Sequence, residues 1–117
     1  MANPAKIPGK QLGTAWNYIS DTVNSSQTKT VDVVALADFK SVKYILTVDS
    51  STSNLVIAEE FIIVYNGSSL QEAVYNRVGS GIDFDVNTLI NGTNLEVQII
   101  NNDANAINIR LMRLITI

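Results

Sequence analysis

The chain has 117 residues, enough for one domain with a hydrophobic core of its own. It contains no cysteine and no histidine, which excludes disulfides, thiolate nucleophiles, imidazole bases and His-ligated zinc. Its net charge is −3, with 16% charged and 46% hydrophobic residues, so it lacks a basic footprint for nucleic acid and has little charge with which to cover its surface. We therefore expect that this protein is a component of a larger assembly and that it does not bind nucleic acid.

Residues 1–13 differ in composition from the rest of the chain. They hold both prolines, Pro4 and Pro8, together with Gly9 and Gly13, and they lack the apolar core of a secretory signal peptide. Proline fixes its own φ and biases the preceding residue to extended geometry, which favours an arm over a helix. A frayed terminus is the alternative. We expect an extended N-terminal arm at 1–13, followed by one domain at 14–117, and an arm that binds a neighbouring subunit through Pro4, Lys6, Ile7, Pro8 and Lys10.

From residue 14 onward, short apolar stretches alternate with turn residues. Val42, Tyr44, Leu46 and Val48 occupy alternate positions, as on one face of a strand. One helical turn fits at 35–39, and no stretch keeps a 3.6-residue period. No apolar run reaches the roughly 18–20 residues of a membrane-spanning helix, so we expect no membrane partner. The expected strands are 16–23, 30–36, 42–49, 55–65, 70–78, 82–86, 95–99 and 107–117.

The connections between these strands carry the residues that tight turns need. Asn66-Gly67 is the strongest hairpin signal, because a type I′ turn requires positive φ at both central positions. Gly79-Ser80-Gly81 and Asn91-Gly92 mark two further turns. Strands spaced about 8–12 residues apart with such turns are typical of an all-β protein. We expect an antiparallel β-sandwich, jelly-roll-like in its connections.

The acidic residues do not form a recognisable catalytic or metal-binding set. Asp83 and Asp85 lie on one strand face and offer two oxygens to a hard cation, but a calcium site needs several more ligands. No pair of carboxylates is marked out for glycoside hydrolysis, which needs two at a defined separation. We expect no catalytic residue, no bound metal and no cofactor, and a protein that is not an enzyme.

Glu59 and Glu60 stand next to each other inside the strand expected at 55–65. Successive strand residues point to opposite faces, so one of the two carboxylates faces inward unless the strand is bulged. Both faces of this strand are apolar, which predicts a second covering layer such as a neighbouring subunit. A buried carboxylate needs a partner, and Arg113 falls on the apolar face of the last strand. We therefore predict a structural ion pair between Glu60 and Arg113, either inside the sandwich or across a subunit interface. The residues expected at the subunit interface are Trp16, Tyr18, Phe61 and Ile63.

About two thirds of the chain, from Val42 to the C-terminus, resembles small β-domains of tailed-bacteriophage virion proteins. The similar stretches are "VKYILTVDSSTSN", "EEFIIVYNG", "GSGIDFDV", "NGTNLEVQII" and "INIRLMRLITI". In that pattern a glutamate precedes an apolar strand that ends in an aromatic residue and Asp/Asn-Gly, and an arginine lies near the end of the domain. Glu60, Tyr65, Asn66-Gly67 and Arg113 match these features, although Tyr65-Asn66 stands where His-Asp is more usual.

The resemblance implies a capsid decoration (cement) protein that stabilises the shell as a symmetric oligomer. It further implies a homotrimer that binds the major capsid protein or other virion proteins on the capsid surface, after assembly in the cytoplasm of the host bacterium. A tail, neck or fibre component with the same domain is the first alternative. A carbohydrate-binding β-sandwich, with exposed aromatics such as Trp16, Tyr18 or Tyr75, is an alternative of another class.

Overall fold

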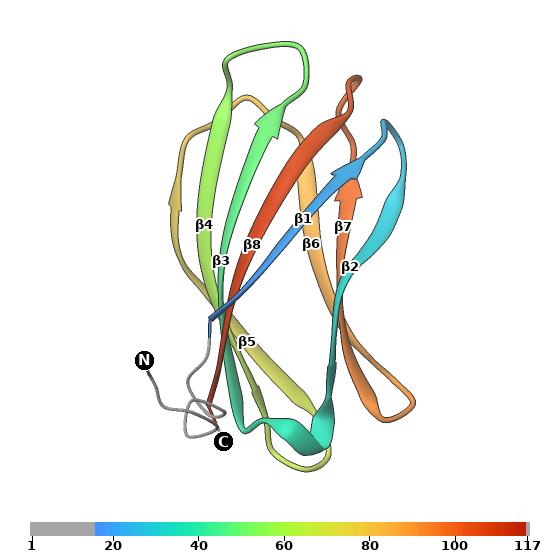
Figure 1. Ribbon diagram of the computed structural model, residues 1–117, viewed down its shortest axis with the longest axis vertical. Helices are drawn as coiled ribbons and strands as arrows, with labels where there is room; N and C mark the ends of the chain where they lie inside the picture. Colours follow the sequence, from blue (N-terminus) through green and yellow to red (C-terminus); the bar gives the residue numbers. More distant parts are fainter. Residues whose placement is uncertain (1–15, 117) are drawn as a thin grey trace, which may run out of the picture.

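The computed structural model describes the backbone of residues 16–116 and the side chains of residues 17–116. Within this range the chain forms eight strands and one short 3-10 helix, as Figure 1 shows. These elements are β1 (Trp16–Val23), β2 (Thr28–Ala35), η1 (Leu36–Asp38), β3 (Ser41–Ser50), β4 (Val56–Tyr65), β5 (Leu70–Val78), β6 (Phe84–Asn91), β7 (Asn94–Asn101) and β8 (Ile107–Thr116). The predicted arm at 1–13 lies outside the described residues, and so do its residues Pro4, Lys6, Ile7, Pro8 and Lys10.

The strands form two antiparallel sheets that pack face to face (Figure 1). The larger sheet has the order β1-β8-β3-β4-β5, and the smaller has the order β2-β7-β6. The chain passes from one sheet to the other after β1, β2, β5 and β7, while β3, β4 and β5 form a meander within one sheet. The prediction of an antiparallel all-β sandwich is confirmed.

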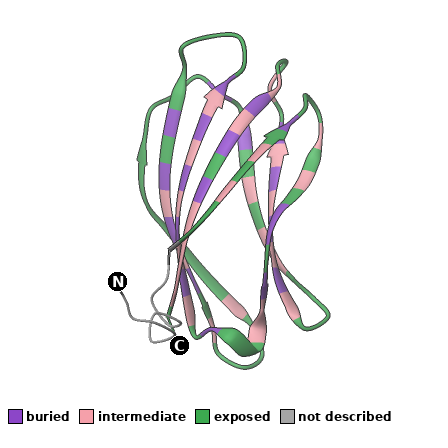
Figure 2. Ribbon diagram, viewed as in Figure 1, coloured by how far each residue is buried: buried purple, intermediate pink, exposed green. Residues whose placement is uncertain are grey.

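The core lies between the sheets and follows the period-2 pattern of the sequence. In β3, Val42, Tyr44, Leu46 and Val48 are fully buried, and their neighbours in sequence are partly exposed. β7 shows the same alternation, as the burial colours along the strands make visible (Figure 2). Tyr44 stacks on Phe61 of β4 with ring centres 5.0 Å apart. The inward-pointing side chains of alternate residues therefore form one core layer between the two sheets.

The connection after β4 differs from the predicted type I′ turn. Residues 66–69 form a four-residue loop, in which Gly67 has φ of +98° and Asn66 does not have positive φ. The side-chain oxygen of Asn66 instead accepts hydrogen bonds from the backbone amides of Ser68 and Ser69, at 3.0 and 2.9 Å. Asparagine stabilises this turn through its side chain rather than through a left-handed backbone.

The other expected elements match the structure with shifted boundaries. The helical turn expected at 35–39 is η1, and the strand expected at 82–86 is β6, which runs on to Asn91. Asn87 and Thr88 lie beyond the end of the expected strand, but both pair with β7 in register. A strand such as β6 can therefore carry polar residues when the strand that it pairs with contributes buried side chains to the core.

Candidate interaction surface

The outward side of the five-stranded sheet, here called the outer face, is unusually rich in apolar side chains. Its members follow from the strand register, because residues directly opposite each other on paired strands point to the same side. Tyr75 is placed on this side by its contacts with Lys43 and Glu60. The apolar members of the outer face are Tyr18, Ile45, Val56, Ala58, Ile62, Val64, Ala73, Tyr75, Val78, Met112 and Leu114.

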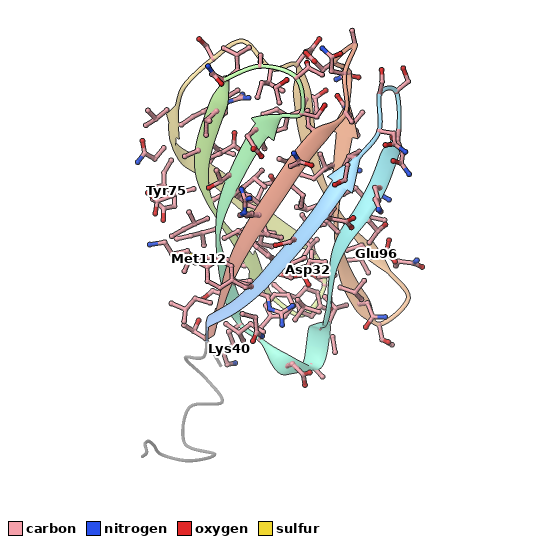
Figure 3. The ribbon with its side chains drawn as sticks, turned by 45° about the horizontal axis from the view of Figure 1, so that its top comes forward. Asp32, Lys40, Tyr75, Glu96 and Met112 are labelled. Carbon is pink, nitrogen blue, oxygen red and sulfur yellow. The ribbon has the colours of Figure 1, made fainter. Side chains whose placement is uncertain are left out.

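Several of these side chains are strongly exposed. Tyr18 is 72% exposed, Val78 65%, and Val56 52%. Figure 3 shows Met112 and Tyr75 on this side of the sandwich, whereas Glu96 of the smaller sheet projects on the opposite side. The prediction that β4 is apolar on both faces thus corresponds to a buried inner face and an uncovered outer one.

The charged groups of the outer face are paired within the chain. Lys43 Nζ lies 3.5 Å from a carboxylate oxygen of Glu60, and Arg110 lies 3.8 Å from Asp49. A hydrogen bond from Asn76 at 3.2 Å, together with Lys43, lowers the pKa of Glu60. The pKa of Lys43 is raised, first by its interaction with the Tyr75 hydroxyl and then by Glu60. Two cations and two anions leave the described outer face with no net charge.

The predicted ion pair between Glu60 and Arg113 is not formed. Glu60 lies opposite Ile45 on the outer face, whereas Arg113 lies opposite Tyr44 and points between the sheets. Arg113 Nη1 instead contacts Asp32 Oδ1 at 2.6 Å, and the Tyr44 hydroxyl donates to the same carboxylate at 2.8 Å. Burial and the nearby Asp32 charge raise the pKa of the Tyr44 hydroxyl, which therefore stays a donor. The partly buried arginine is paired, but its partner comes from the other sheet.

Glu59 is the glutamate that faces inward. It is 6% exposed and lies 3.5 Å from Arg77 Nε of β5, while the Arg77 guanidinium stacks 4.8 Å from the ring centre of Phe84. Burial raises the pKa of Glu59; Arg77 opposes that shift and Glu72 adds to it. The register between β4 and β5 shifts next to Glu60, and the extra residue is Tyr75. The strand itself keeps its alternation, and the bulge is in its partner.

Two of the four predicted interface residues lie in the core. Phe61 and Ile63 are fully buried between the sheets, because they share a face with Ile57. Tyr18 points outward from β1, and the side chain of Trp16 lies outside the described part of the chain. The outward residues of β4 are those of even number, such as Ile62 and Val64, so the prediction that Phe61 and Ile63 lie at a subunit interface is corrected by the register.

Asp32 and Asn101 were not predicted as structural residues. Asp32 follows Val31 without alternation, because the pairing of β2 with β7 shifts register between Thr30 and Asp32. Asn101 is fully buried; its amide donates to the carbonyls of Val23 and Asn105 at 3.0 and 2.9 Å. The position of a β-bulge cannot be predicted from the alternation of apolar and polar residues. No feature of the sequence therefore indicated that Asp32 points inward. Asn101 stood in the run "NNDAN", where turn chemistry was the natural interpretation.

Two shallow hollows lie at opposite ends of the sandwich. One, of about 520 Å³, lies beside η1 and the β4–β5 loop and includes Phe39, Lys40, Tyr65 and Asn66. The other, of about 490 Å³, is polar and lies over β1 and β8 near the Lys29–Asp21 ion pair. Neither brings together the groups that a catalytic or metal site requires, and residues 16–116 contain no cluster of three or more metal-ligating side chains.

Within residues 16–116, no helix has the length and apolarity to span a membrane.

The exposed tyrosines do not form one sugar-stacking platform. Tyr18 lies on β1 and Tyr75 on β5, at opposite edges of the larger sheet. Four strand spacings of about 4.8 Å separate them by roughly 19 Å, too far for both to contact a single sugar ring. The carbohydrate-binding alternative therefore has no paired aromatic site among the described residues.

No protein-family model and no curated protein matches this chain. The solved structures that match this chain include three phage tailspike proteins. The tailspike protein of Acinetobacter baumannii phage AM24 has a TM-score of 0.54 at 6% identity, covering 96% of this chain and 28% of that one. The tailspike protein gp49 of A. baumannii bacteriophage Fri1, a capsular polysaccharide depolymerase, has a TM-score of 0.49 at 17% identity, covering 95% and 19%. The tailspike protein of Acinetobacter phage vB_ApiP_P1 has a TM-score of 0.43 at 9% identity, covering 95% and 23%.

These neighbours correct one prediction. The sequence predicted a protein that is not an enzyme, and this is contradicted by the Fri1 protein, which is a capsular polysaccharide depolymerase. The prediction rested on the residues of this chain alone. Since the chain spans about a fifth of that depolymerase, and less than a third of the other two tailspikes, its residues do not describe the chemistry of a whole protein of that kind.

Proposed function

We propose that this chain is a β-sandwich domain of a bacteriophage virion protein, located at the tail and of the tailspike type. The observation that carries the proposal is the AM24 tailspike, whose fold matches 96% of this chain with a TM-score of 0.54. The match covers 28% of that tailspike, so the proposal concerns one domain-sized part of such a protein. The resemblance of the sequence to phage virion β-domains points in the same direction.

The geometry suits a domain that attaches to other protein surfaces. The core between the sheets is closed by apolar side chains. The outer face is a broad sheet surface without net charge, on which the apolar side chains stand beside polar ones such as Thr22, Thr47 and Asn108. Large exposed apolar patches on soluble proteins mark sites of association. The outer face is therefore the proposed attachment surface of the domain.

Tail location is favoured over the capsid-decoration role that the sequence resemblance implied. Both roles need a small β-domain that binds neighbouring virion proteins, and the sequence patterns shared with either are mostly those of β-hairpins. The fold match is to a tailspike, and it includes β1 and β2, which lie in the part of the sequence that resembles no virion protein. We accordingly propose tail proteins, rather than the major capsid protein, as neighbours of this domain.

The test is to locate the chain in virions of the phage that encodes it. Antibodies raised against the purified chain are coupled to gold, and labelled virions are imaged by electron microscopy. Label at the tail is the expected result. Label over the capsid would overturn tail location in favour of decoration, and virions that carry no label, with the chain absent from their mass spectrum, would overturn a virion role altogether.

A further inference from the structure

We infer that the outer face of the five-stranded sheet is a self-association surface, covered in the assembled protein by the outer face of a second copy of this chain. This deepens the proposed attachment role, on which it rests, by naming the partner. The central strands of the face carry Ile45, Ile62 and Met112, and its edges carry the strongly exposed Tyr18 and Val78. Such a surface is unfavourable in water and favourable in contact with another apolar surface.

The size of the outer face matches the size of a protein–protein contact. Five strands about 4.8 Å apart and some eight residues long, at about 3.3 Å per residue, give a footprint of roughly 600 Å². Two such faces together bury roughly 1,200 Å², the lower end of the range for specific protein–protein interfaces. A contact of that size between two copies is larger than most crystal-packing contacts and does not require a further partner.

The charges of the outer face favour a second copy over a charged partner. Lys43 is paired with Glu60, and Arg110 with Asp49, so the described outer face is neutral although the chain carries −3. A partner recognised by charge would need unpaired groups of one sign on this surface. Two copies meeting through these faces bring no excess of like charge together.

The other broad surface of the sandwich does not offer a comparable contact. On the outward side of the smaller sheet, polar residues such as Asp85, Asn87, Glu96 and Gln98 surround the exposed Val33. An apolar face loses free energy when it covers polar groups that are then left without partners. The surface of this chain that best complements the outer face is therefore the outer face itself, which relates the two copies by a twofold axis.

The experiment measures the solution mass of the full chain by light scattering over a range of concentrations. We expect twice the mass of one chain, unchanged by added salt because the ion pairs are internal. Ala58→Glu places a charge at an exposed position of the outer face, and Met112→Glu places one near its centre; each should shift the mass to that of a monomer. Val33→Glu, on the opposite side of the sandwich, is the matched control and should leave the mass unchanged.

A full-length chain that is monomeric throughout would overturn the inference. A monomer that associates only after removal of residues 1–13 would likewise overturn it, in favour of those residues as the occupant of the outer face. An oligomer that persists in folded Ala58→Glu and Met112→Glu would place the contact elsewhere. Circular dichroism identifies variants that fail to fold, and Ala58→Glu alone decides the matter if Met112→Glu does not fold. None of these results depends on where the chain is found in a virion, so the two proposals fail separately.

Discussion

At the scale of single residues, the fold depends on charged groups that the two sheets bury between them. Asp32 is 8% exposed and receives hydrogen bonds from Arg113 and Tyr44, each from the opposite sheet. Removing water from such groups is costly, and their mutual contacts offset that cost only while all the partners are present. The Arg113–Asp32 pair therefore joins the two sheets by polar contacts within a mostly apolar layer.

Arg113→Ala should lower the free energy of unfolding by about 3 kcal/mol, the usual cost of leaving one partner of a buried ion pair unpaired. The Lys43–Glu60 pair is on the surface, where solvent screens the charges, so Lys43→Ala, the matched control, should lower it far less. Urea unfolding followed by tryptophan fluorescence measures both. Equal losses in the two variants would show that the Arg113–Asp32 pair adds nothing beyond a surface contact.

Glu59 gives the protein a pH dependence of known sign. Burial raises its pKa in the folded state, so it contributes stability that is fully present below its unfolded pKa of about 4.3 and is lost as pH rises through the folded value. Glu59→Gln lacks this titration. The free energy of unfolding of the variant minus that of wild type should therefore be larger at neutral pH than near pH 4. The lowered pKa values of Asp21 and Glu60 affect both proteins alike and cancel in this difference.

Urea unfolding of wild type and Glu59→Gln at a series of pH values measures this difference. A difference in free energy that stays constant from acid to neutral pH would mean that the pKa of Glu59 is the same in the folded and unfolded states. A difference that grows toward acid pH would mean that the pair with Arg77 outweighs burial.

At the scale of elements, the turns decide how the strands are aligned. Gly67 and Gly79 both have φ near +100°, a backbone region that residues with a Cβ rarely adopt. Their surroundings differ. A Cβ at Gly67 would meet nothing within 4 Å, whereas one at Gly79 would overlap the carbonyl oxygen of Val56 at the start of β4. The chain leaving β5 therefore passes close against the backbone of β4, which only glycine permits.

Gly79→Ala should destabilise the protein more than Gly67→Ala does. Both variants pay the backbone strain of a side chain at positive φ, roughly 1–2 kcal/mol, and Gly79→Ala must in addition move β4 or the residues after β5. The urea unfolding midpoints of the two variants give the comparison. Equal midpoints would contradict the close approach at Gly79, because strain at φ is common to both.

At the scale of the whole molecule, the fold depends on pairing between strands that are far apart in the sequence. β1 pairs with β8, and β8 lies between β1 and β3 in the centre of the larger sheet. The larger sheet is therefore completed only when the last strand is in place, and such non-local pairing is typical of slowly folding all-β proteins. The same arrangement brings residues from β1, β3, β4, β5 and β8 together on the outer face. That surface is a property of the assembled sheet and is absent from any single hairpin.

The strands, most of the turns and the apolar character of both faces of β4 could be predicted from the sequence. Side-chain alternation is a local property of the strand, and apolar residues at every second position, as in Val42–Val48, show it without knowledge of any partner. The low share of charged residues likewise predicted exposed apolar side chains, which the outer face carries. The resemblance to phage virion domains implied a small β-domain, and the fold comparison shows a similar fold in a phage tailspike.

The partners of the buried charges were decided only by the tertiary structure. Asp32 and Arg113 are 81 positions apart, and they meet because β2 and β8 lie in opposite sheets. The bulge before Asp32 turns that carboxylate inward against the alternation of its neighbours. In the same way, Glu59 rather than Glu60 points inward because the register of β4 with β3 places Glu59 opposite the buried Leu46. Local pattern determines that a strand has two faces, but sheet assignment and register, which depend on contacts between distant segments, determine which face is buried and against what.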